Sequence, residues 1–292
     1  MRGSPLERYD RAARRSAAVV IAQYSTSFAL ATRILPRATR AHIRNIYALV
    51  RLADEVVDGV GTESGLQPPQ IAEALAALEA DTYRAMGIGY STNLVVHAFA
   101  GTARAVGIEE GIVRPFFGSM RMDVEVTRHT PESFERYVDG SAEVVGLMCL
   151  RAFLAAGPPP SADELVRLEA GARRLGAAFQ KVNFLRDLAA DDEGLGRAYF
   201  PGVEPHRLDE PTKLRLLDDI DADLDAAAAV LPLLRPGARR GVALAHGLFA
   251  ELSVRLRRTP AQELRRTRVR VPDPVKARLA ALALADQLPR RR

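Results

Sequence analysis

The chain has very little cysteine and no long apolar run. Cys149 is the only cysteine among 292 residues, and it lies in the apolar stretch GLMCLRAFL, where a free thiol behaves as a small hydrophobic side chain. A disulfide framework and a cysteine metal site are therefore excluded. The sequence has no run of about 18 apolar residues, and its start, MRGSPLERYDRAARRS, lacks the apolar segment of a secretory signal. We expect a soluble cytoplasmic protein, or at most one that is peripheral to a membrane.

The sequence also lacks a fixed-period repeat and a low-complexity linker. The short GPPPS run at residues 157–161 is flanked by amphipathic segments, so it predicts a tight corner between helices rather than a hinge. With 48% hydrophobic residues, the chain is long enough to bury one large core. We therefore predict a single domain over residues 1–292.

The net charge of +5 is concentrated at the C-terminal end of the chain. Residues 251–292 hold twelve Arg or Lys against four acidic residues, whereas the rest of the chain holds 29 against 32. The favoured interpretation is a solvated terminal helix that belongs to the same domain. Peripheral contact of this basic segment with anionic lipid is the alternative. Nucleic acid would be attracted by the same charges, but we do not expect it as a partner.

Hydrophobic periodicity predicts an all-α fold. Apolar residues recur at three- and four-residue steps in segments of about 15 to 30 residues. Proline and glycine separate these segments, and Ser161 with Glu164 indicates a capping box at one helix start. The predicted helices span residues 6–33, 37–59, 69–86, 91–106, 109–127, 131–156, 161–191, 211–231, 237–257 and 272–287.

Two pairs of aspartates, each spaced four residues apart, carry the clearest chemical signal. Asp54 and Asp58 lie in YALVRLADEVVDG, and Asp187 and Asp191 lie in QKVNFLRDLAADDEG. On a helix such a pair shares one face, with the Cβ atoms about 6 Å apart. Because apolar residues flank both pairs, an unpaired charge there would cost roughly several kcal/mol. Mg²⁺ suits such a site, since it binds a few carboxylates and shares its other positions with phosphate oxygens.

Each aspartate pair taken alone is more often a chance arrangement on a solvated helix face. The polar neighbours of both pairs favour the metal site. Arg51 precedes the first pair by three residues, and Gln180, Asn183 and Arg186 precede the second pair at helical steps. A stripe of amides and carboxylates on an otherwise apolar helix indicates a site for a metal and a diphosphate.

Several blocks of the sequence, in a fixed order, resemble one family of enzymes. The blocks are YSTSF (24–28), YALVRLADEVVD (47–58), SMRMDVEVTR (119–128), ERYVDGSAEVVGLM (135–148), QKVNFLRDLAADDEGLGRAYFP (180–201) and RVRVP (268–272). They resemble the squalene and phytoene synthase family of head-to-head prenyltransferases, and within it the bacterial phytoene synthases. The resemblance extends from about residue 16 to about residue 276.

The resemblance implies the isoprenoid synthase fold, which is a single all-α domain with a central apolar cavity and two facing Asp-rich helices at its mouth. It also implies that Asp54, Asp58, Asp187 and Asp191 are catalytic residues that bind two or three Mg²⁺ ions bridging to diphosphate. The residues that would hold the diphosphate are polar or basic. They are Ser25, Ser27, Arg51, Gln180, Asn183, Arg186, Arg197 and Tyr199.

Further residues would line the cavity if the resemblance holds. Phe28, Tyr47 and Tyr137 would lie near the reacting carbons, where an aromatic face stabilises a carbocation, with Tyr137 as a catalytic residue. Asp123 would join the polar ring at the mouth. Gly146 would leave room for an isoprenoid chain close to the backbone.

The implied reaction is a phytoene synthase-type condensation of two prenyl diphosphates, with geranylgeranyl diphosphate favoured, through a cyclopropylcarbinyl diphosphate. Squalene synthases finish with a hydride from NADPH and often carry a membrane anchor, whereas phytoene synthases lose a proton. We expect Mg²⁺ because of the paired carboxylates, and no NADPH because the overall pattern, with no anchor, favours phytoene synthesis. Three alternatives stay open: a dehydrosqualene or presqualene diphosphate synthase using farnesyl diphosphate, a single-substrate class I terpene synthase, and a helical scaffold without catalysis.

Two segments depart from the family pattern. YVDGSAEVVG places Asp139, Ser141 and Glu143 where phytoene synthases commonly have apolar, small or tyrosine residues. We expect these side chains to influence the substrate length or the product. ALAHGLFAEL lacks a tyrosine that relatives commonly place near the diphosphate. His246 is a candidate substitute, and a structural role for this histidine is the alternative.

Overall fold

The computed structural model describes residues 4–195 and 198–286, and the side chains among them other than those of residues 189–195. These residues form an all-helical fold without a strand, and one isolated bridge joins Arg128 to Ala198. The helices are α1 (Pro5–Tyr24), α2 (Thr26–Ile34), α3 (Arg37–Val57), α4 (Val60–Glu63), α5 (Pro68–Ile88), α6 (Leu94–Val106), α7 (Glu110–Glu125), α8 (Pro131–Val138), α9 (Val144–Leu154), α10 (Ala162–Leu195), α11 (Glu210–Val230), α12 (Pro236–Arg258), α13 (Ala261–Leu264) and α14 (Asp273–Leu284), with shorter turns η1 (Asp139–Glu143), η2 (Pro205–Arg207) and η3 (Leu231–Leu233).

The predicted all-α class is confirmed, but two of the predicted helices are divided. The helix predicted over 6–33 is wrong as one element, because Ser25 is extended (φ −144°, ψ 117°) and starts α2. Its hydroxyl accepts a hydrogen bond from the Phe28 N–H, which compensates for the main-chain bond lost at the break. The helix predicted over 131–156 contains the π-helical turn η1 between α8 and α9. Two short helices, α4 and α13, were not predicted.

The helix α2 runs back along one face of α3. Near the start of α2, the ring of Phe28 lies 6.0 Å from the ring of Tyr47. Beyond its end, the Leu35 carbonyl accepts hydrogen bonds from Nε and Nη2 of Arg40, at 3.2 and 2.8 Å. The start of α2 therefore lies beside the middle of α3, and the end of α2 lies beside the start of α3. The two helices are antiparallel.

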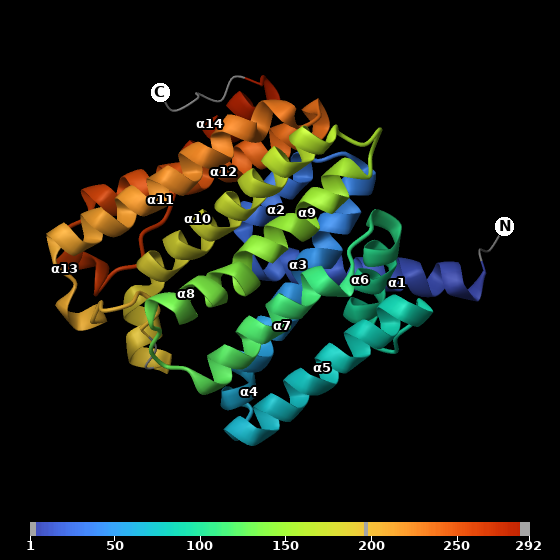
Figure 1. Ribbon diagram of the computed structural model, residues 1–292, viewed down its shortest axis with the longest axis horizontal. Helices are drawn as coiled ribbons and strands as arrows, with labels where there is room; N and C mark the ends of the chain where they lie inside the picture. The colour runs from blue at the N-terminus through green and yellow to red at the C-terminus, as the bar shows by residue number, and fades with distance from the viewer. Residues whose placement is uncertain (1–3, 196–197, 287–292) are drawn as a thin grey trace.

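The core is organised around two large hydrophobic clusters. One fills the space between α3, α5, α6, α7 and α9 and contains the fully buried rings of Phe99, Phe116 and Phe117. The other surrounds α10 and includes apolar residues of α8, α11, α12, α13 and α14. Figure 1 shows α10 lying between the α8–α9 segment and the α11–α12 pair. None of the described helices combines the length and apolar character that a membrane crossing needs.

Candidate active site

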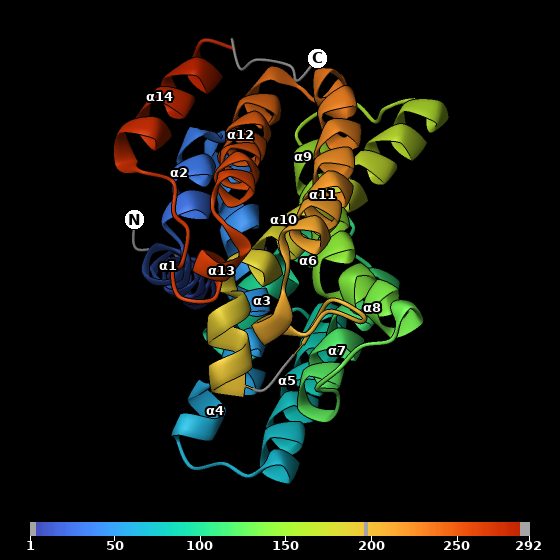
Figure 2. The ribbon, with the colours of Figure 1, turned by 90° about the vertical axis from the view of Figure 1, so that its left-hand side faces the viewer.

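The first aspartate pair lies at the C-terminal end of α3. Asp58 is the C-cap residue, and its N–H donates a 2.7 Å hydrogen bond to the carbonyl of Asp54. Figure 2 shows that α3 ends toward α4 and that the C-terminal part of α10, which carries Asp187, descends toward the same end of the molecule. The fold therefore directs the two Asp-bearing helix ends to one region.

The Asp54 carboxyl is placed where a negative charge is unfavourable. Its side chain is 28% exposed. Burial and the nearby Asp58 carboxylate raise the pKa of Asp54 to about 7, against the opposite effect of Arg51. Arg51 compensates for little of this charge, since its Nη1 is 3.9 Å from Asp54 Oδ2 and its Nη2 is bonded to Glu55. A cation between the two aspartates would stabilise both carboxylates.

One donor of Arg51 lacks an acceptor among the described residues. Its guanidinium lies 4.5 Å above the ring of Tyr24. Its Nε atom is buried and has no hydrogen-bond partner among the described residues. A buried donor without an acceptor is unfavourable, and a phosphate oxygen would supply one.

Tyr137 lies close to both aspartate-bearing helices. Its hydroxyl donates a 3.0 Å hydrogen bond to Oδ2 of the buried Asp123. Burial raises the pKa of Tyr137 well above its ordinary value, and the charges of Asp123, Tyr199 and Asp58 raise it further. On the other side, its ring is 5.9 Å from the ring of Phe184 on α10. The structure thus brings the predicted Tyr137, Asp123 and Asp58 into one neighbourhood.

A stack of rings continues from Tyr137. The Tyr199 ring lies 4.0 Å from the Phe184 ring at an interplanar angle of 11°. His129, which was not predicted, is buried with its ring 4.9 Å from that of Tyr137. Its only sequence signal was its position directly after the SMRMDVEVTR block. Tyr199 is buried in this stack, and the contact with diphosphate expected for it stays a prediction.

Asp187, from the second aspartate pair, is held by two arginines. Nε of Arg186 donates to its Oδ1 at 2.9 Å, and Nε of Arg268 lies 2.7 Å from the same oxygen. Arg268 was not predicted as a site residue, although it begins the RVRVP block. The side chain of Asp191 and the whole of Arg197 lie outside the described residues.

The predicted amide stripe lies on α10 as expected. Gln180 and Asn183 are both half-buried on the turns that precede Asp187. Nε2 of Gln180 donates to Oγ of Ser141 in η1 at 3.4 Å. The YVDGSAEVVG segment, residues 137–146, is called the wall segment below, and its Ser141 contacts a residue that was predicted to hold diphosphate.

The two acids of that wall segment share one cation. Nη1 of Arg173, on α10, lies 2.6 Å from Oδ1 of Asp139 and 3.4 Å from Oε2 of Glu143. Since Asp139 and Glu143 begin and end the π-helical turn, one guanidinium ties both of its ends to α10. Asp139 and Glu143, which depart from the family pattern, are thus paired with an arginine of the same chain.

Two glycines let the wall segment approach α10 closely. A Cβ atom on Gly146 would lie 2.3 Å from the Ala172 carbonyl oxygen, and one on Gly176 would lie 2.3 Å from that of Ala142. Any larger residue would separate the helices. The structure therefore gives Gly146 a packing role, and its expected contact with an isoprenoid chain stays a prediction.

The α2 residues predicted for the site lie beside Tyr47. Ser25 caps α2 and is also hydrogen-bonded to the side chain of Tyr47. Burial raises the pKa of Tyr47, so its hydroxyl is neutral and can donate. Ser27 is half-buried on the first turn of α2. Ser25 and Tyr47 are thus brought together, while the substrate contacts of all three stay predictions.

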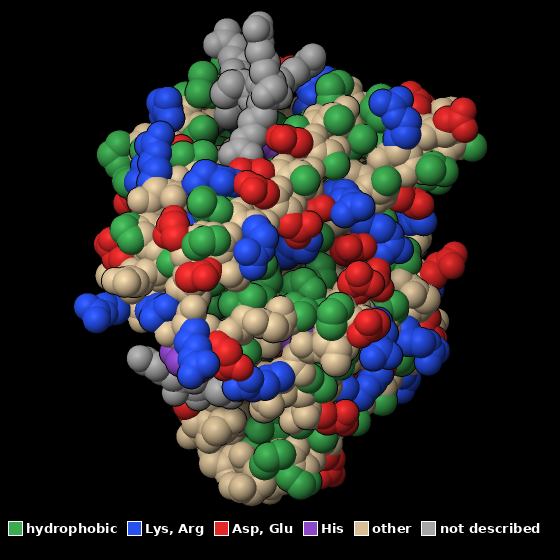
Figure 3. Space-filling view, turned by 60° about the vertical axis from the view of Figure 1, so that its left-hand side comes forward, with side chains coloured by type: hydrophobic (Ala, Val, Ile, Leu, Met, Phe, Trp, Pro, Cys, Tyr) green, Lys and Arg blue, Asp and Glu red, His purple; other side chains and the backbone are tan. Residues whose placement is uncertain are grey.

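Phe28 belongs to an aromatic cluster between α2, α3, α10 and α12. Its ring lies 5.6 Å from those of Phe179 and Phe249, which stack on each other at 3.8 Å. In the view of Figure 3 the surface is hollowed near its centre, where hydrophobic side chains appear between acidic and basic ones. The central apolar cavity itself stays a prediction.

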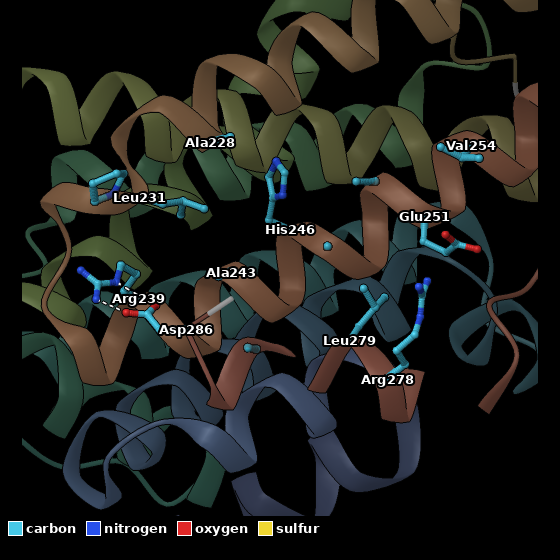
Figure 4. A pocket seen from close by; sticks show the side chains of 14 residues that line it. Ala228, Leu231, Arg239, Ala243, His246, Glu251, Val254, Arg278, Leu279 and Asp286 are labelled. Atoms are coloured by element: carbon cyan, nitrogen blue, oxygen red, sulfur yellow. Dashed lines mark hydrogen bonds and ion pairs between the residues drawn. The ribbon is translucent and has the colours of Figure 1, made fainter. Parts of the chain in front are cut away.

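A separate groove of about 380 Å³ lies between α11, α12 and α14. Figure 4 shows His246 pointing into it from α12 toward α11. Nε2 of His246 donates to the Leu224 carbonyl at 2.9 Å, so this histidine links two helices. None of the predicted carboxylates lines the groove. The structural role is therefore the one that the contacts of His246 support.

The described residues fit a magnesium ion that is shared with a substrate. No group of three or more His, Cys, Asp or Glu within the described part of the chain forms a complete metal site. Mg²⁺ commonly needs only one or two carboxylates when phosphate oxygens supply the remaining ligands. Burial and the repulsion from Asp58 raise the pKa of Asp54, and a cation at this position would offset both effects.

The chain is similar to known proteins in sequence and in fold. The sequence matches the squalene/phytoene synthase family over residues 21–274. It is 29% identical over 254 residues to a 15-cis-phytoene synthase of a Paracoccus species, covering 82% of this chain and 80% of the relative. A phytoene synthase of Mycobacterium tuberculosis is 32% identical over 218 residues, covering 73% of this chain and 65% of the relative.

Two further comparisons concern a presqualene diphosphate synthase and a dehydrosqualene synthase. A presqualene diphosphate synthase of Rhodopseudomonas palustris is 27% identical over 249 residues, covering 84% of this chain and 79% of the relative. The crystal structure of a dehydrosqualene synthase has the same fold, with a TM-score of 0.78 over 97% of this chain and 99% of that chain. Its sequence identity is 21%, so this likeness concerns the fold alone. The predicted isoprenoid synthase fold is confirmed.

Proposed function

The chain belongs to the squalene/phytoene synthase family, and from this premise we propose that it is a prenyltransferase that joins two prenyl diphosphates head to head and releases diphosphate. One observation in the chain carries the proposal. One turn apart on α3, the Asp54 carboxyl has its cationic partner, Nη1 of Arg51, at 3.9 Å, and the buried Nε of Arg51 lacks an acceptor among the described residues. A metal ion bound to a diphosphate would satisfy both groups at once.

The proposed metal ligands are the four aspartates of the two pairs, Asp54, Asp58, Asp187 and Asp191. Bound Mg²⁺ would act as a Lewis acid that stabilises the charge of the leaving diphosphate. Arg186 and Arg268, which pair with Asp187, would donate to phosphate oxygens when a metal ion neutralises that carboxylate.

The other polar residues would orient the diphosphate. Arg51 supplies a guanidinium beside the first pair, and Gln180 and Asn183 supply amide donors on α10. The residues proposed to contact it further are Ser25, Ser27, Arg186, Arg197 and Tyr199. Donors that are fixed before the C–O bond breaks stabilise the charge that develops in that step.

The aromatic residues would protect the allylic carbocation that remains after diphosphate has left. The rings of Phe28, Tyr47, Tyr137 and Phe184 offer faces that stabilise an allylic carbocation, and their burial excludes water from it. Attack by the double bond of the second substrate, followed by loss of one proton as the cyclopropane ring closes, would then give a cyclopropylcarbinyl diphosphate. Its ionisation, rearrangement and loss of a proton would give the hydrocarbon without NADPH.

We propose geranylgeranyl diphosphate as the substrate, which would place the enzyme in carotenoid biosynthesis. The phytoene synthases among the relatives support this choice. Farnesyl diphosphate is the second candidate, favoured by the presqualene diphosphate synthase relative and by the fold shared with a dehydrosqualene synthase. The ratio of kcat/KM for the two substrates, measured without NADPH, decides between them.

The metal assignment is tested by replacing one aspartate of each pair. We expect Asp54→Ala and Asp187→Ala to lose most of the Mg²⁺-dependent diphosphate release while circular dichroism shows an intact fold. Asp163→Ala, which changes an exposed acid in the first turn of α10, is the matched control and should keep full activity. Unchanged turnover in the two test variants would refute the assignment.

We further propose a cytoplasmic location with peripheral lipid contact through the basic segment 251–292. Parts of this segment are already neutralised within the fold. Arg257 pairs with Asp218 and Asp221 of α11, and Arg268 pairs with Asp187. Co-sedimentation with anionic vesicles that does not change when residues 287–292 are removed would count against a role for the terminal arginines.

A further inference from the structure

One face of α3 carries a row of cationic and aromatic side chains along α2. Arg40, Arg44, Tyr47 and Arg51 follow one another at steps of four, three and four residues, so they lie on the same side of the helix. Arg44 and Arg51 share one feature: in both, Nε is buried and has no hydrogen-bond partner among the described residues. Buried donors of this kind indicate a missing acceptor.

The proposed diphosphate site accounts for Arg51 but not for Arg44. Arg44 lies seven residues before Arg51, which corresponds to two turns and about 10 Å along the helix axis. Tyr47 lies between them and contacts Phe28 of α2. A diphosphate held by Arg51 and the Asp pair therefore does not reach Arg44, which needs a second acceptor.

Two further arginines surround Arg44. Burial lowers the pKa of Arg44, and the charges of Arg40 and Arg33 lower it further. Arg40 is fixed in place because Nε and Nη2 both donate to the Leu35 carbonyl. Within the described chain, no hydrogen bond or ion pair joins Arg33 or Arg44 to an acceptor. Arg33 and Arg40 thus lie close enough to Arg44, at the corner between α2 and α3, for their charges to act on its guanidinium.

The first part of the chain offers no carboxylate to neutralise this cluster. Residues 1–50 contain nine arginines and only two acids, Glu7 and Asp10. The Glu7 carboxylate accepts a hydrogen bond from the Ser4 N–H, and Asp10 is bonded to His97. Like charges that converge without a counterion lower stability, and a bound anion would relieve this repulsion.

We propose that Arg33, Arg40 and Arg44 form a binding site for a phosphate group, separate from the catalytic diphosphate site. Guanidinium groups donate paired N–H groups to phosphate oxygens, and three of them from two helices can bind several oxygens of one phosphate. The phosphate belongs either to free phosphate or diphosphate or to a phospholipid headgroup. The site does not depend on the proposed catalytic function.

The first experiment measures inorganic phosphate binding by calorimetry in EDTA. The Arg51→Gln protein is the background, because this removes the neighbouring donor at the catalytic site. We expect Arg44→Gln or Arg33→Gln in this background to weaken phosphate binding by at least about tenfold, since each removes a charged donor. The control, Arg167→Gln on α10, removes an equal charge from an exposed position and should change binding by less than about twofold. Because Arg33 is exposed, Arg33→Gln keeps the test valid should Arg44→Gln fold poorly.

The second experiment identifies the source of the phosphate. The same proteins are sedimented with phosphatidylglycerol vesicles and with phosphatidylcholine vesicles that lack net charge. Binding to phosphatidylglycerol that is lost in Arg33→Gln and Arg44→Gln but kept in Arg167→Gln assigns the site to a lipid headgroup. Loss of free phosphate binding alone assigns it to a soluble phosphate. Equal binding by all variants in both experiments, or equal loss in Arg167→Gln, overturns the proposal.

Discussion

The hydroxyl of Tyr137 donates a 3.0 Å hydrogen bond to Oδ2 of Asp123, and both side chains are buried, at 3% and 6% exposure. Burial and the nearby charge of Asp123 raise the pKa of Tyr137 well above its ordinary value. The phenol therefore keeps its proton through the neutral pH range and acts as a hydrogen-bond donor. The charge of Asp58 acts on Tyr137, and the Phe184 ring lies 5.9 Å from the Tyr137 ring, so Tyr137 lies near both aspartate-bearing helices.

Tyr137→Phe removes the donor and leaves Asp123 buried with one partner fewer. We expect the free energy of unfolding to fall by about 1–3 kcal/mol, measured by urea denaturation at pH 7. Turnover should fall as well, because the ring no longer holds a fixed orientation. Asp123→Asn keeps an acceptor for the hydroxyl and should cost less stability. Equal stability of Tyr137→Phe and the unchanged protein would show that the hydrogen bond contributes nothing.

Arg173→Ala removes the ion pairs that join α10 to Asp139 and Glu143 of the wall segment. Its guanidinium is 40% exposed and its partner Asp139 is 41% exposed, so we expect a loss of only about 0.5–1 kcal/mol of unfolding free energy. The ratio of turnover with farnesyl and geranylgeranyl diphosphate should change more, because Ser141 in the released turn contacts Gln180. Arg173→Lys should restore the ratio in part, and Arg167→Ala on the same helix should leave it unchanged. An unaltered ratio in Arg173→Ala contradicts a role of this wall in substrate choice.

The apparent affinity for Mg²⁺ should depend on pH near neutrality. Because the pKa of Asp54 is raised to about 7, its carboxyl is increasingly protonated below pH 7 and ionised above it. Only the ionised form binds a metal, so each pH unit below 7 should weaken apparent Mg²⁺ binding by up to about tenfold. Mg²⁺ titrations of diphosphate release at pH 6 and pH 8 measure this directly. The dependence should be absent in Asp54→Asn, and a flat profile in the unchanged protein is the contrary result.

Cys149 should react slowly while the protein is folded. Burial raises the pKa of its thiol to about 12, so at pH 8 the reactive thiolate is scarce. We expect a disulfide reagent to label the folded protein at least about a hundredfold more slowly than the urea-unfolded protein, in which the thiol pKa is about 8.5. Rapid labelling of the folded chain at pH 8 would show that the thiol is accessible and ionised.

Local patterns in the sequence predicted most of the helices and the main polar residues of the site. Asp54, Asp58 and Asp187 lie on the two helices where their four-residue spacing placed them, and Gln180 lies on the turns before Asp187. These features depend on helical periodicity, which residues within a few turns determine. The break at Ser25 was missed because the apolar period continues across it while a single side chain caps the next helix.

The missed contacts join residues that are far apart in the chain. Arg268 is 81 residues from Asp187, and Arg173 is 34 residues from Asp139. Periodicity gives the face of a helix but not which distant arginine packs against it. Tertiary packing decides these pairs, so only the structure shows that Asp139 and Glu143 are neutralised by α10.

The central claim is the head-to-head condensation of two prenyl diphosphates at a site built from both aspartate pairs. Mass spectrometry of the product made from geranylgeranyl diphosphate with Mg²⁺ and without NADPH tests it most directly. The expected product is a hydrocarbon with twice the carbon number of the substrate's prenyl chain, formed together with released diphosphate. A product that contains only one prenyl unit would contradict it.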